Sequence, residues 1–188
     1  MIKNCKIAHN TTVCDYTNLY GCQIDDNVFV GPFVEIQKGS IVGENSRISS
    51  HSFICEGVTI GKNCFIGHGV MFINDKYTEK NEDWELQKTY IGDDVRIGSN
   101  ATILPIRIGK GAIIGAGSVV TIDVPAGVTV MGNPARGKWF QCKFFKILLK
   151  EPDRNILRII GHEKDAEEER WQNLMLKLTK EDKRPLLT

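Results

Sequence analysis

Three polar residues whose types suit substrate recognition recur at a spacing of 18 positions. Lys38, Glu56 and Asn74 carry an amine, a carboxylate and a carboxamide, and each is 18 residues from the next. If the backbone repeats with that period, their side chains form one column, with His51 and His68 beside it on adjacent turns. Such a cluster offers hydrogen-bond partners for hydroxyl groups and for an amine. These residues can act together only if the chain has a repeat that stacks them.

A six-residue repeat supplies that stacking. A small or β-branched residue follows each repeated aliphatic position by four, and glycine often follows it directly. Neither a helix, with apolar spacings of three and four, nor an alternating strand has a period of six. The pattern predicts an all-β parallel β-helix in which three hexads form one coil of 18 residues. The nine consecutive repeat positions are Ile24, Val30, Ile36, Val42, Ile48, Ile54, Ile60, Ile66 and Phe72.

The repeat is interrupted once and then gives way to a different segment. Ile73 to Tyr90 is polar and charged, so we expect residues 74–90 to leave the solenoid as a loop on its binding face. The period resumes at Ile91 and continues to Val120. Residues 1–137 are therefore predicted to form the β-helix domain. Residues 138–188 show helical apolar spacing and are predicted to be a helical extension that caps the solenoid or contacts another subunit.

Composition and charge exclude several classes of protein. The 24 Lys and Arg residues balance 23 Asp and Glu residues, which argues against nucleic-acid binding. No apolar run approaches the roughly 20 residues of a membrane span, so we expect a soluble, cytoplasmic protein without a membrane partner. The six cysteines form no C-x-x-C pair and are interpreted as small buried residues. Only two histidines lie in the candidate region, so we expect no catalytic metal.

Six stretches of the sequence resemble the left-handed β-helix N-acetyltransferases that act on nucleotide-linked amino sugars. The resemblance implies a left-handed winding, a homotrimer with active sites between neighbouring subunits, and acetyl-CoA bound along the C-terminal coils. It also implies a dTDP-linked or UDP-linked amino sugar as the acceptor. The matching stretches are 33–37, 50–61, 67–75, 97–104, 115–120 and 132–136.

The resemblance and the stacking together give a set of expected site residues. Asn74, His51 and Glu56 are the expected catalytic residues. The sugar nucleotide is expected to contact Glu35, Gln37, Lys38, Phe53, His68 and Asp75. Acetyl-CoA is expected to contact Ser99, Ala101, Ala116 and Ser118 with its acyl and pantetheine part, and Asn133, Pro134 and Arg136 with its nucleotide end.

The expected reaction is direct attack of the sugar amine on the thioester, without an acyl-enzyme. Asn74 would orient the amine, while backbone N–H groups near Ser99 or Ala116 would hold the oxyanion. Two other functions stay open at this point. The same fold could acylate a small acceptor such as serine or an antibiotic hydroxyl, with His51 or His68 as the general base. The chain could also be a non-catalytic β-helix scaffold. The sequence leaves open the nucleotide, the position of the amine and the acyl group.

Overall fold

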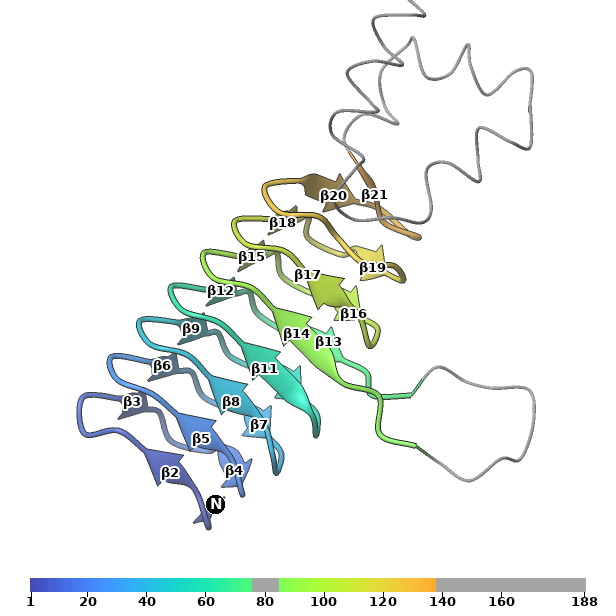
Figure 1. Cartoon of the computed structure of the whole chain (residues 1–188). Helices are drawn as coiled ribbons and strands as arrows, with labels where there is room; N and C mark the ends of the chain where they lie inside the picture. Colours follow the sequence, from blue (N-terminus) through green and yellow to red (C-terminus); the bar gives the residue numbers. More distant parts are fainter. Residues whose placement is uncertain (76–84, 138–188) are drawn as a thin grey trace, which may run out of the picture. The chain divides into compact units, whose positions relative to one another are not determined.

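A computed structural model describes residues 1–75 and 85–137. These residues form a parallel β-solenoid whose short strands build three sheets, arranged as the walls of a prism (Figure 1). The predicted all-β repeat fold is therefore confirmed. The expected helical extension, 138–188, and the middle of the expected loop lie outside the described residues. Among the residues described, no helix is long and apolar enough to cross a membrane.

Each of the first six coils contributes one strand to each sheet. The first sheet contains β1 (Ile2–Lys3), β4 (Asn18–Tyr20), β7 (Glu35–Ile36), β10 (Phe53–Ile54), β13 (Met71–Phe72), β16 (Thr102–Ile103) and β19 (Val119–Val120). The second contains β2 (Lys6–Ile7), β5 (Gln23–Ile24), β8 (Ile41–Val42), β11 (Val58–Ile60), β14 (Thr89–Ile91) and β17 (Arg107–Ile108). The third contains β3 (Thr12–Val13), β6 (Phe29–Val30), β9 (Arg47–Ile48), β12 (Phe65–Ile66), β15 (Arg96–Ile97), β18 (Ile113–Ile114), β20 (Thr129–Met131) and β21 (Arg136–Gly137).

The strand register confirms the period that the sequence predicts. Glu35 in β7 pairs with Phe53 in β10, which is 18 residues further along the chain. Where the sequence has a five-residue step, the offset falls to 17, as between Asn18 and Glu35. Across the insertion the offset grows to 31, and Phe65 pairs with Arg96. Residues one coil apart in sequence are therefore vertical neighbours throughout the solenoid.

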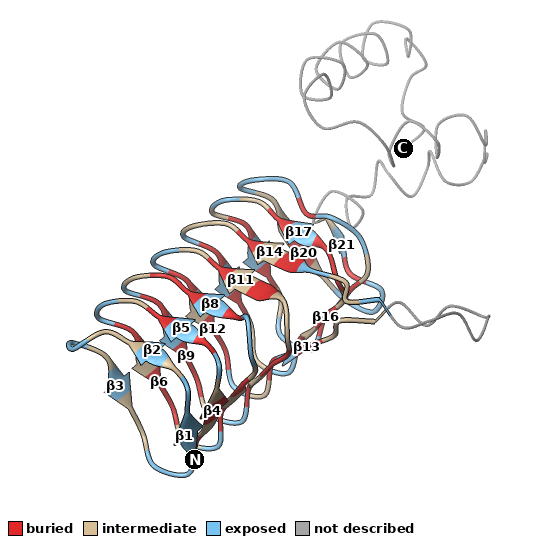
Figure 2. Ribbon diagram, turned by 60° about the horizontal axis from the view of Figure 1, so that its bottom comes forward, coloured by how far each residue is buried: buried red, intermediate tan, exposed pale blue. Residues whose placement is uncertain are grey.

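The repeated aliphatic residues fill the interior of the prism. All nine consecutive repeat positions are at most 1% exposed, and the burial colours follow the inner face of the coils (Figure 2). Burying each of these side chains contributes about 1.5–3 kcal/mol before entropy costs. The small residue four positions later is also buried and tucks in at the corner. Where it is serine, its hydroxyl donates to a carbonyl of the next coil: Ser40 to Cys55, Ser46 to Gly61, and Ser52 to Gly67, at 2.8–2.9 Å.

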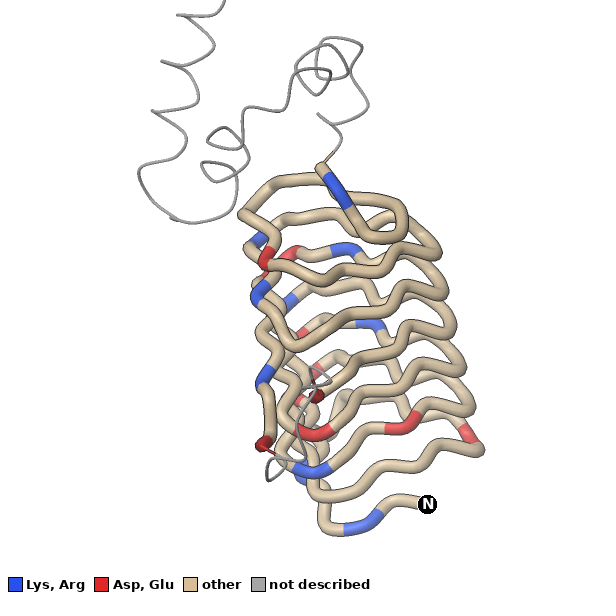
Figure 3. The backbone as a smooth tube through the Cα atoms, turned by 90° about the vertical axis from the view of Figure 1, so that its right-hand side faces the viewer, with Lys and Arg blue, Asp and Glu red and all other residues tan. Residues whose placement is uncertain are grey.

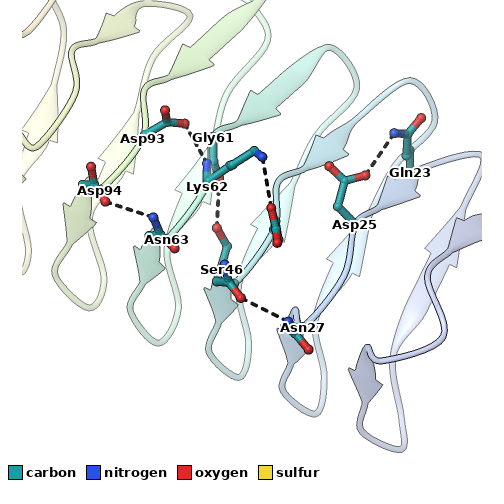
Figure 4. A network of polar contacts seen from close by, with 11 residues as sticks. Gln23, Asp25, Asn27, Ser46, Gly61, Lys62, Asn63, Asp93 and Asp94 are labelled. Carbon is teal, nitrogen blue, oxygen red and sulfur yellow. Dashed lines mark hydrogen bonds and ion pairs between the residues drawn. The ribbon is translucent and has the colours of Figure 1, made fainter.

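Polar residues stack at the corner where the second sheet turns into the third. Asn27, Asn45, Asn63 and Asp94 occupy left-handed backbone conformations there, with φ between 55° and 60°. Asn and Asp tolerate this region better than other residues with a side chain. Their side chains join neighbouring coils, as between Asn27 and Asn45 at 3.3 Å and between Asn63 and Asp94 at 3.2 Å (Figure 4). A polar ladder is thus a structural feature of this solenoid and does not by itself mark a site.

Charged residues of both signs are interspersed along the coils (Figure 3). Two ion pairs near the polar ladder join successive coils, Lys62 to Glu44 at 3.0 Å and Lys110 to Asp94 at 3.4 Å. Exposed pairs of this kind contribute roughly 0–1 kcal/mol each. The solenoid is therefore stabilised mainly by its apolar interior.

One boundary differs from the sequence-based expectation. The loop was expected to extend to residue 90, but β14 begins at Thr89, so Thr89 and Tyr90 belong to the second sheet. These residues complete a coil because they pair with Val58 and Thr59 of β11. The last strand of the described solenoid, β21, pairs with β20 in the antiparallel direction.

The two isoleucines of β18 provide a direct test of this packing. Ile114 is 1% exposed and Ile113 is 43% exposed. Replacing Ile114 with Ala should lower the free energy of unfolding by about 2–5 kcal/mol, because it leaves a cavity in the interior. The matched control Ile113→Ala should cost about 1 kcal/mol or less. Chemical denaturation of both variants measures the difference, and equal losses would contradict the assigned inward and outward directions.

Candidate functional site

The predicted column forms at the corner where the first sheet turns into the second, which we call the loop corner. Lys38, Glu56 and Asn74 follow β7, β10 and β13 at this corner. The Nζ atom of Lys38 lies 3.4 Å from Oε2 of Glu56. The Nδ2 atom of Asn74 donates to the backbone carbonyl of Glu56 at 3.5 Å. The prediction that these three residues are brought together by coil stacking is thus confirmed.

The insertion leaves the solenoid directly above this column. The carbonyl of Asn74 accepts a hydrogen bond from the Gln87 amide at 3.2 Å, which closes the base of the insertion. The Thr89 amide then donates to the Gly57 carbonyl at 3.3 Å as the chain re-enters the second sheet. Asp75 is the last described residue before the gap and is half-buried. Asn74 therefore has a structural role as well as a place in the candidate site.

Glu35 organises a polar network below the column. Its two carboxylate oxygens accept from Asn18 Nδ2 at 3.0 Å and from Gln37 Nε2 at 3.0 Å, and the Tyr20 hydroxyl lies at 3.5 Å. The Oε1 atom of Gln37 accepts from the backbone amide of Glu56 at 3.2 Å, so this network reaches the column. Partial burial and the Glu35 carboxylate both raise the pKa of Tyr20. Its hydroxyl therefore stays a hydrogen-bond donor.

Phe53 lies beside this network on the outer face of the first sheet. It pairs with Glu35 on one side and Met71 on the other, and it is half-buried against the core. Met71 is 41% exposed, so the two side chains give this part of the outer face an apolar surface. This surface offers apolar contacts to a ligand bound at the loop corner.

The two histidines lie on the other edge of the first sheet. They follow β9 and β12 at the corner where the third sheet turns into the first, which we call the histidine corner. We expected them beside the column, but strand β10 separates His51 from Glu56. The expectation was wrong because residues six apart lie on successive corners, and His68 precedes Asn74 by six residues.

Each histidine has a defined partner at this corner. His51 has φ 62° and stacks on Phe33, with ring centroids 4.8 Å apart, and Phe33 stacks on Tyr16 at 5.4 Å. The Nδ1 atom of His68 lies 2.8 Å from the Ser50 hydroxyl, 18 residues earlier. His51 and His68 were expected almost in register on adjacent coils, and the vertical partner of His68 is Ser50, one residue before His51. The histidine corner thus carries one stacked and one hydrogen-bonded imidazole.

The expected acyl-binding residues divide into exposed and buried positions. The backbone amide of His68 donates to the Ser99 hydroxyl at 3.2 Å, so Ser99 continues the histidine corner upward. Ala116 follows at the same corner and is exposed. Ala101 and Ser118, however, are 0% exposed. They cannot line a ligand in the single chain, because the small residue four positions after each aliphatic residue points into the prism.

Ser118 instead positions the last hairpin. Its hydroxyl accepts from the Gly132 amide at 3.1 Å, and the Ala135 amide donates to the Val119 carbonyl at 2.7 Å. These bonds hold the β20–β21 hairpin against the last coil. The three residues expected at the nucleotide end of acetyl-CoA are exposed on this hairpin: Asn133, Pro134 and Arg136.

Sequence analysis missed several contributors to these clusters. Ser50 was detectable, because it precedes His68 by 18 residues and so had to lie beneath it. Asn18 was detectable in the same way once the shortened coil was counted, since it precedes Glu35 by 17. Tyr20 was detectable by the same count, since it precedes Gln37 by 17. Within residues 1–75 and 85–137, no group of three or more His, Cys, Asp or Glu side chains is placed to hold a metal ion.

Comparisons with known proteins agree with this fold. The family description "hexapeptide repeat of succinyl-transferase" matches residues 57–71 and 88–121, and "bacterial transferase hexapeptide (six repeats)" matches residues 21–56. The bifunctional protein GlmU of Thermotoga maritima is 36% identical over 141 residues, which cover 66% of this chain and 30% of that protein. The chain thus spans only 30% of the length of this relative.

Two solved structures extend the comparison. The hexapeptide-repeat-containing acetyltransferase VCA0836 of Vibrio cholerae, complexed with acetyl coenzyme A, has a TM-score of 0.55 and 29% identity over 63% of this chain and 69% of its own. A mutant of AntD, an N-acyltransferase of Bacillus cereus in complex with dTDP and coenzyme A, has a TM-score of 0.60 and 19% identity, covering 73% of this chain and 87% of its own. At that identity, the second likeness shows the fold alone. The repeat matches and the solenoid together show that residues 21–71 and 88–121 are similar to the hexapeptide repeats of these transferases.

Proposed function

We propose that this chain transfers an acetyl group from acetyl-CoA to the amino group of a nucleotide-linked amino-deoxy sugar. The observation that carries the proposal is the contact of Lys38, Glu56 and Asn74 at the base of the insertion. The 29% identical acetyltransferase complexed with acetyl coenzyme A supports the donor. The resemblance of residues 33–37, 50–61 and 67–75 to sugar-nucleotide acetyltransferases supports the acceptor.

Asn74 is proposed to orient the attacking amine. Its Nδ2 atom faces the Glu56 carbonyl, so its Oδ1 atom is the one presented to the amine of a substrate. An amide oxygen is a weak base, and its contribution is to hold the nitrogen lone pair toward the thioester carbon. The Glu56 carboxylate, 28% exposed, is placed to bind a sugar hydroxyl or the amine itself. The C–N bond then forms, the C–S bond breaks, and the amine proton passes to solvent or to the departing thiolate.

The buried cysteines support direct attack over an acyl-enzyme. Burial raises the pKa of Cys55 to about 11 and also raises that of Cys64, and both side chains are 2% exposed. Because the thiolate is the nucleophilic form, a thiol that stays protonated at neutral pH is a poor acyl acceptor. The acetyl group is therefore proposed to move from sulfur to nitrogen in one transfer.

A homotrimer would complete the site. The amine-binding residues lie at the loop corner, whereas His68, Ser99 and Ala116 lie at the histidine corner on the other edge of the first sheet. Backbone N–H groups near Ser99 or Ala116 are proposed to stabilise the oxyanion. Packing a second copy against this face brings the histidine corner of one subunit toward the loop corner of the next. The proposed active sites therefore lie between subunits.

A hydroxyl acceptor is the second candidate, and the Ser50–His68 contact favours it. If His68 donates its Nδ1 proton to the Ser50 hydroxyl at 2.8 Å, its Nε2 atom carries a lone pair and can act as a general base. A hydroxyl needs such a base, since it must lose its proton as it attacks. An amine, which attacks as the neutral molecule, does not.

Replacing Asn74 with Ala tests the amine-binding role. We expect kcat for a nucleotide-linked amino sugar to fall at least tenfold, while acetyl-CoA affinity changes little. The control Gln23→Ala removes a carboxamide that contacts Asp25 at another corner and should leave kcat unchanged. Release of CoA measures both variants, and full activity of Asn74→Ala would remove this residue from the mechanism.

Thermal unfolding with acetyl-CoA tests donor binding against the scaffold alternative. Acetyl-CoA at 100 times its Kd should stabilise the folded state by about 2.7 kcal/mol and raise Tm. The shift should shrink in Arg136→Ala, which removes an exposed cation of the last hairpin, and persist in Arg96→Ala on β15. If wild-type protein shows no shift at saturating concentrations, the chain is a scaffold without a donor site.

The activity of the His68→Ala variant separates the two acceptors. For amine transfer, we expect this variant to keep at least a tenth of wild-type kcat. For hydroxyl transfer, the variant should be inactive, because the acceptor hydroxyl has lost its general base. Release of CoA measures kcat, and an inactive variant would replace the amine proposal with the hydroxyl one.

A further inference from the structure

A hollow of about 450 Å³ lies at the N-terminal end of the loop corner. It is lined by Met1, Lys3, Asn4, Tyr20, Gly21 and Lys38, which come from the first three coils. Its size is within the range of small-molecule sites. Lys38 borders both this hollow and the Glu56–Asn74 column, so the two features are continuous along one corner.

The hollow depends on the missing side chain of Gly21. This residue has φ +62°, and a Cβ atom built on it would lie 2.8 Å from the Cβ of Lys38. A larger residue would therefore meet the Lys38 stem and fill the space between the coils that carry Lys3 and Lys38. The glycine leaves a concave surface with a lysine on either side.

The lining of the hollow includes two cationic side chains. Two of the six are lysines and none is a carboxylate. Two acidic groups lie next to it: Glu56 pairs with Lys38 at 3.4 Å, and Glu35 is 3.5 Å from the Tyr20 hydroxyl. The pair with Glu56 is largely open to solvent, since Lys38 is 66% exposed, and an exposed pair of this kind is weak. Lys38 can therefore contact an anion in the hollow without a large loss.

We propose that this hollow binds the diphosphate of the nucleotide-linked sugar, with Lys3 and Lys38 as its cationic ligands. The proposal rests on the proposed function, because it concerns the same acceptor molecule. The spacing of the coils also fixes the orientation of the bound nucleotide-linked sugar. Lys38 is one coil below Glu56 and two below Asn74, and each coil rises about 4.8 Å. A diphosphate anchored at Lys38 places its attached sugar ring along Glu56, with the amine toward Asn74.

Isothermal titration with UDP and with dTDP tests this site in the full-length protein. At least one of them should bind wild-type protein, and uridine or thymidine alone should bind much more weakly. Lys3→Gln and Lys38→Gln should each weaken binding by about tenfold, the effect of losing one charged contact. Lys3→Gln is the cleaner variant, because Lys38→Gln also unpairs Glu56. Binding should weaken as salt is raised.

Lys110→Gln is the matched control. Lys110 pairs with Asp94 at the same 3.4 Å and is 69% exposed, but it lies at the opposite end of the solenoid on another corner. This variant should bind the nucleotide within twofold of wild type. The proposal is overturned if neither nucleotide binds wild-type protein, if the nucleosides bind as well as the diphosphates, or if Lys3→Gln binds like the control.

Acetyl-CoA titrations of the same proteins separate this inference from the proposed function. If wild-type protein and both lysine variants bind acetyl-CoA equally while the variants lose the nucleotide, the diphosphate site stands. If the lysine variants bind both acetyl-CoA and the nucleotide as wild-type protein does, the diphosphate site is overturned and the proposed function is not. If wild-type protein binds no acetyl-CoA, the proposed acetyl transfer fails, whatever the nucleotide does.

Discussion

Backbone pairing between consecutive coils is the constraint on which the rest of this structure depends. Each short strand bonds to the strand one coil earlier, at an offset of 18 residues that changes only where a coil is shortened or the insertion intervenes. The offset converts distance along the sequence into height along the solenoid. It places Lys38, Glu56 and Asn74 in contact, although 36 residues separate the first from the last.

The same constraint decides which residues a ligand can reach. Ala101 follows Ile97 by four residues, and Ser118 follows Ile114 by four. This is the corner position that points inward throughout the repeat, and both residues are fully buried. Their place in the repeat is consistent with burial, although the family resemblance led us to expect them beside acetyl-CoA. The structure agrees with the period, because a corner that tucks into the prism needs a small side chain.

Two features of the site differ in how far the sequence could have shown them. Residues 18 apart share a corner, whereas residues six apart lie on successive corners, and His68 precedes Asn74 by six. The hexad position could therefore have placed the histidines correctly, beyond β10 at another corner. The hollow beside Lys38 could not be predicted, because it depends on how closely the Gly21 backbone approaches the Lys38 side chain.

The two corners give the first sheet a polar edge on each side of a partly apolar face. One edge carries Lys38, Glu56 and Asn74, which we propose bind the sugar and its amine. The other edge carries His68 and Ser99, which we propose lie near the thioester. The hydrogen-bonding residues at the loop corner are outward-facing, so they can vary without disturbing the interior.

A crystal structure of the protein with CoA and a nucleotide-linked amino sugar tests the central claim most directly. The account predicts that the sugar nitrogen lies about 3 Å from Oδ1 of Asn74, with Glu56 in contact with the same sugar. A sugar nitrogen or hydroxyl bound at His68, with no contact to Asn74 or Glu56, would contradict it.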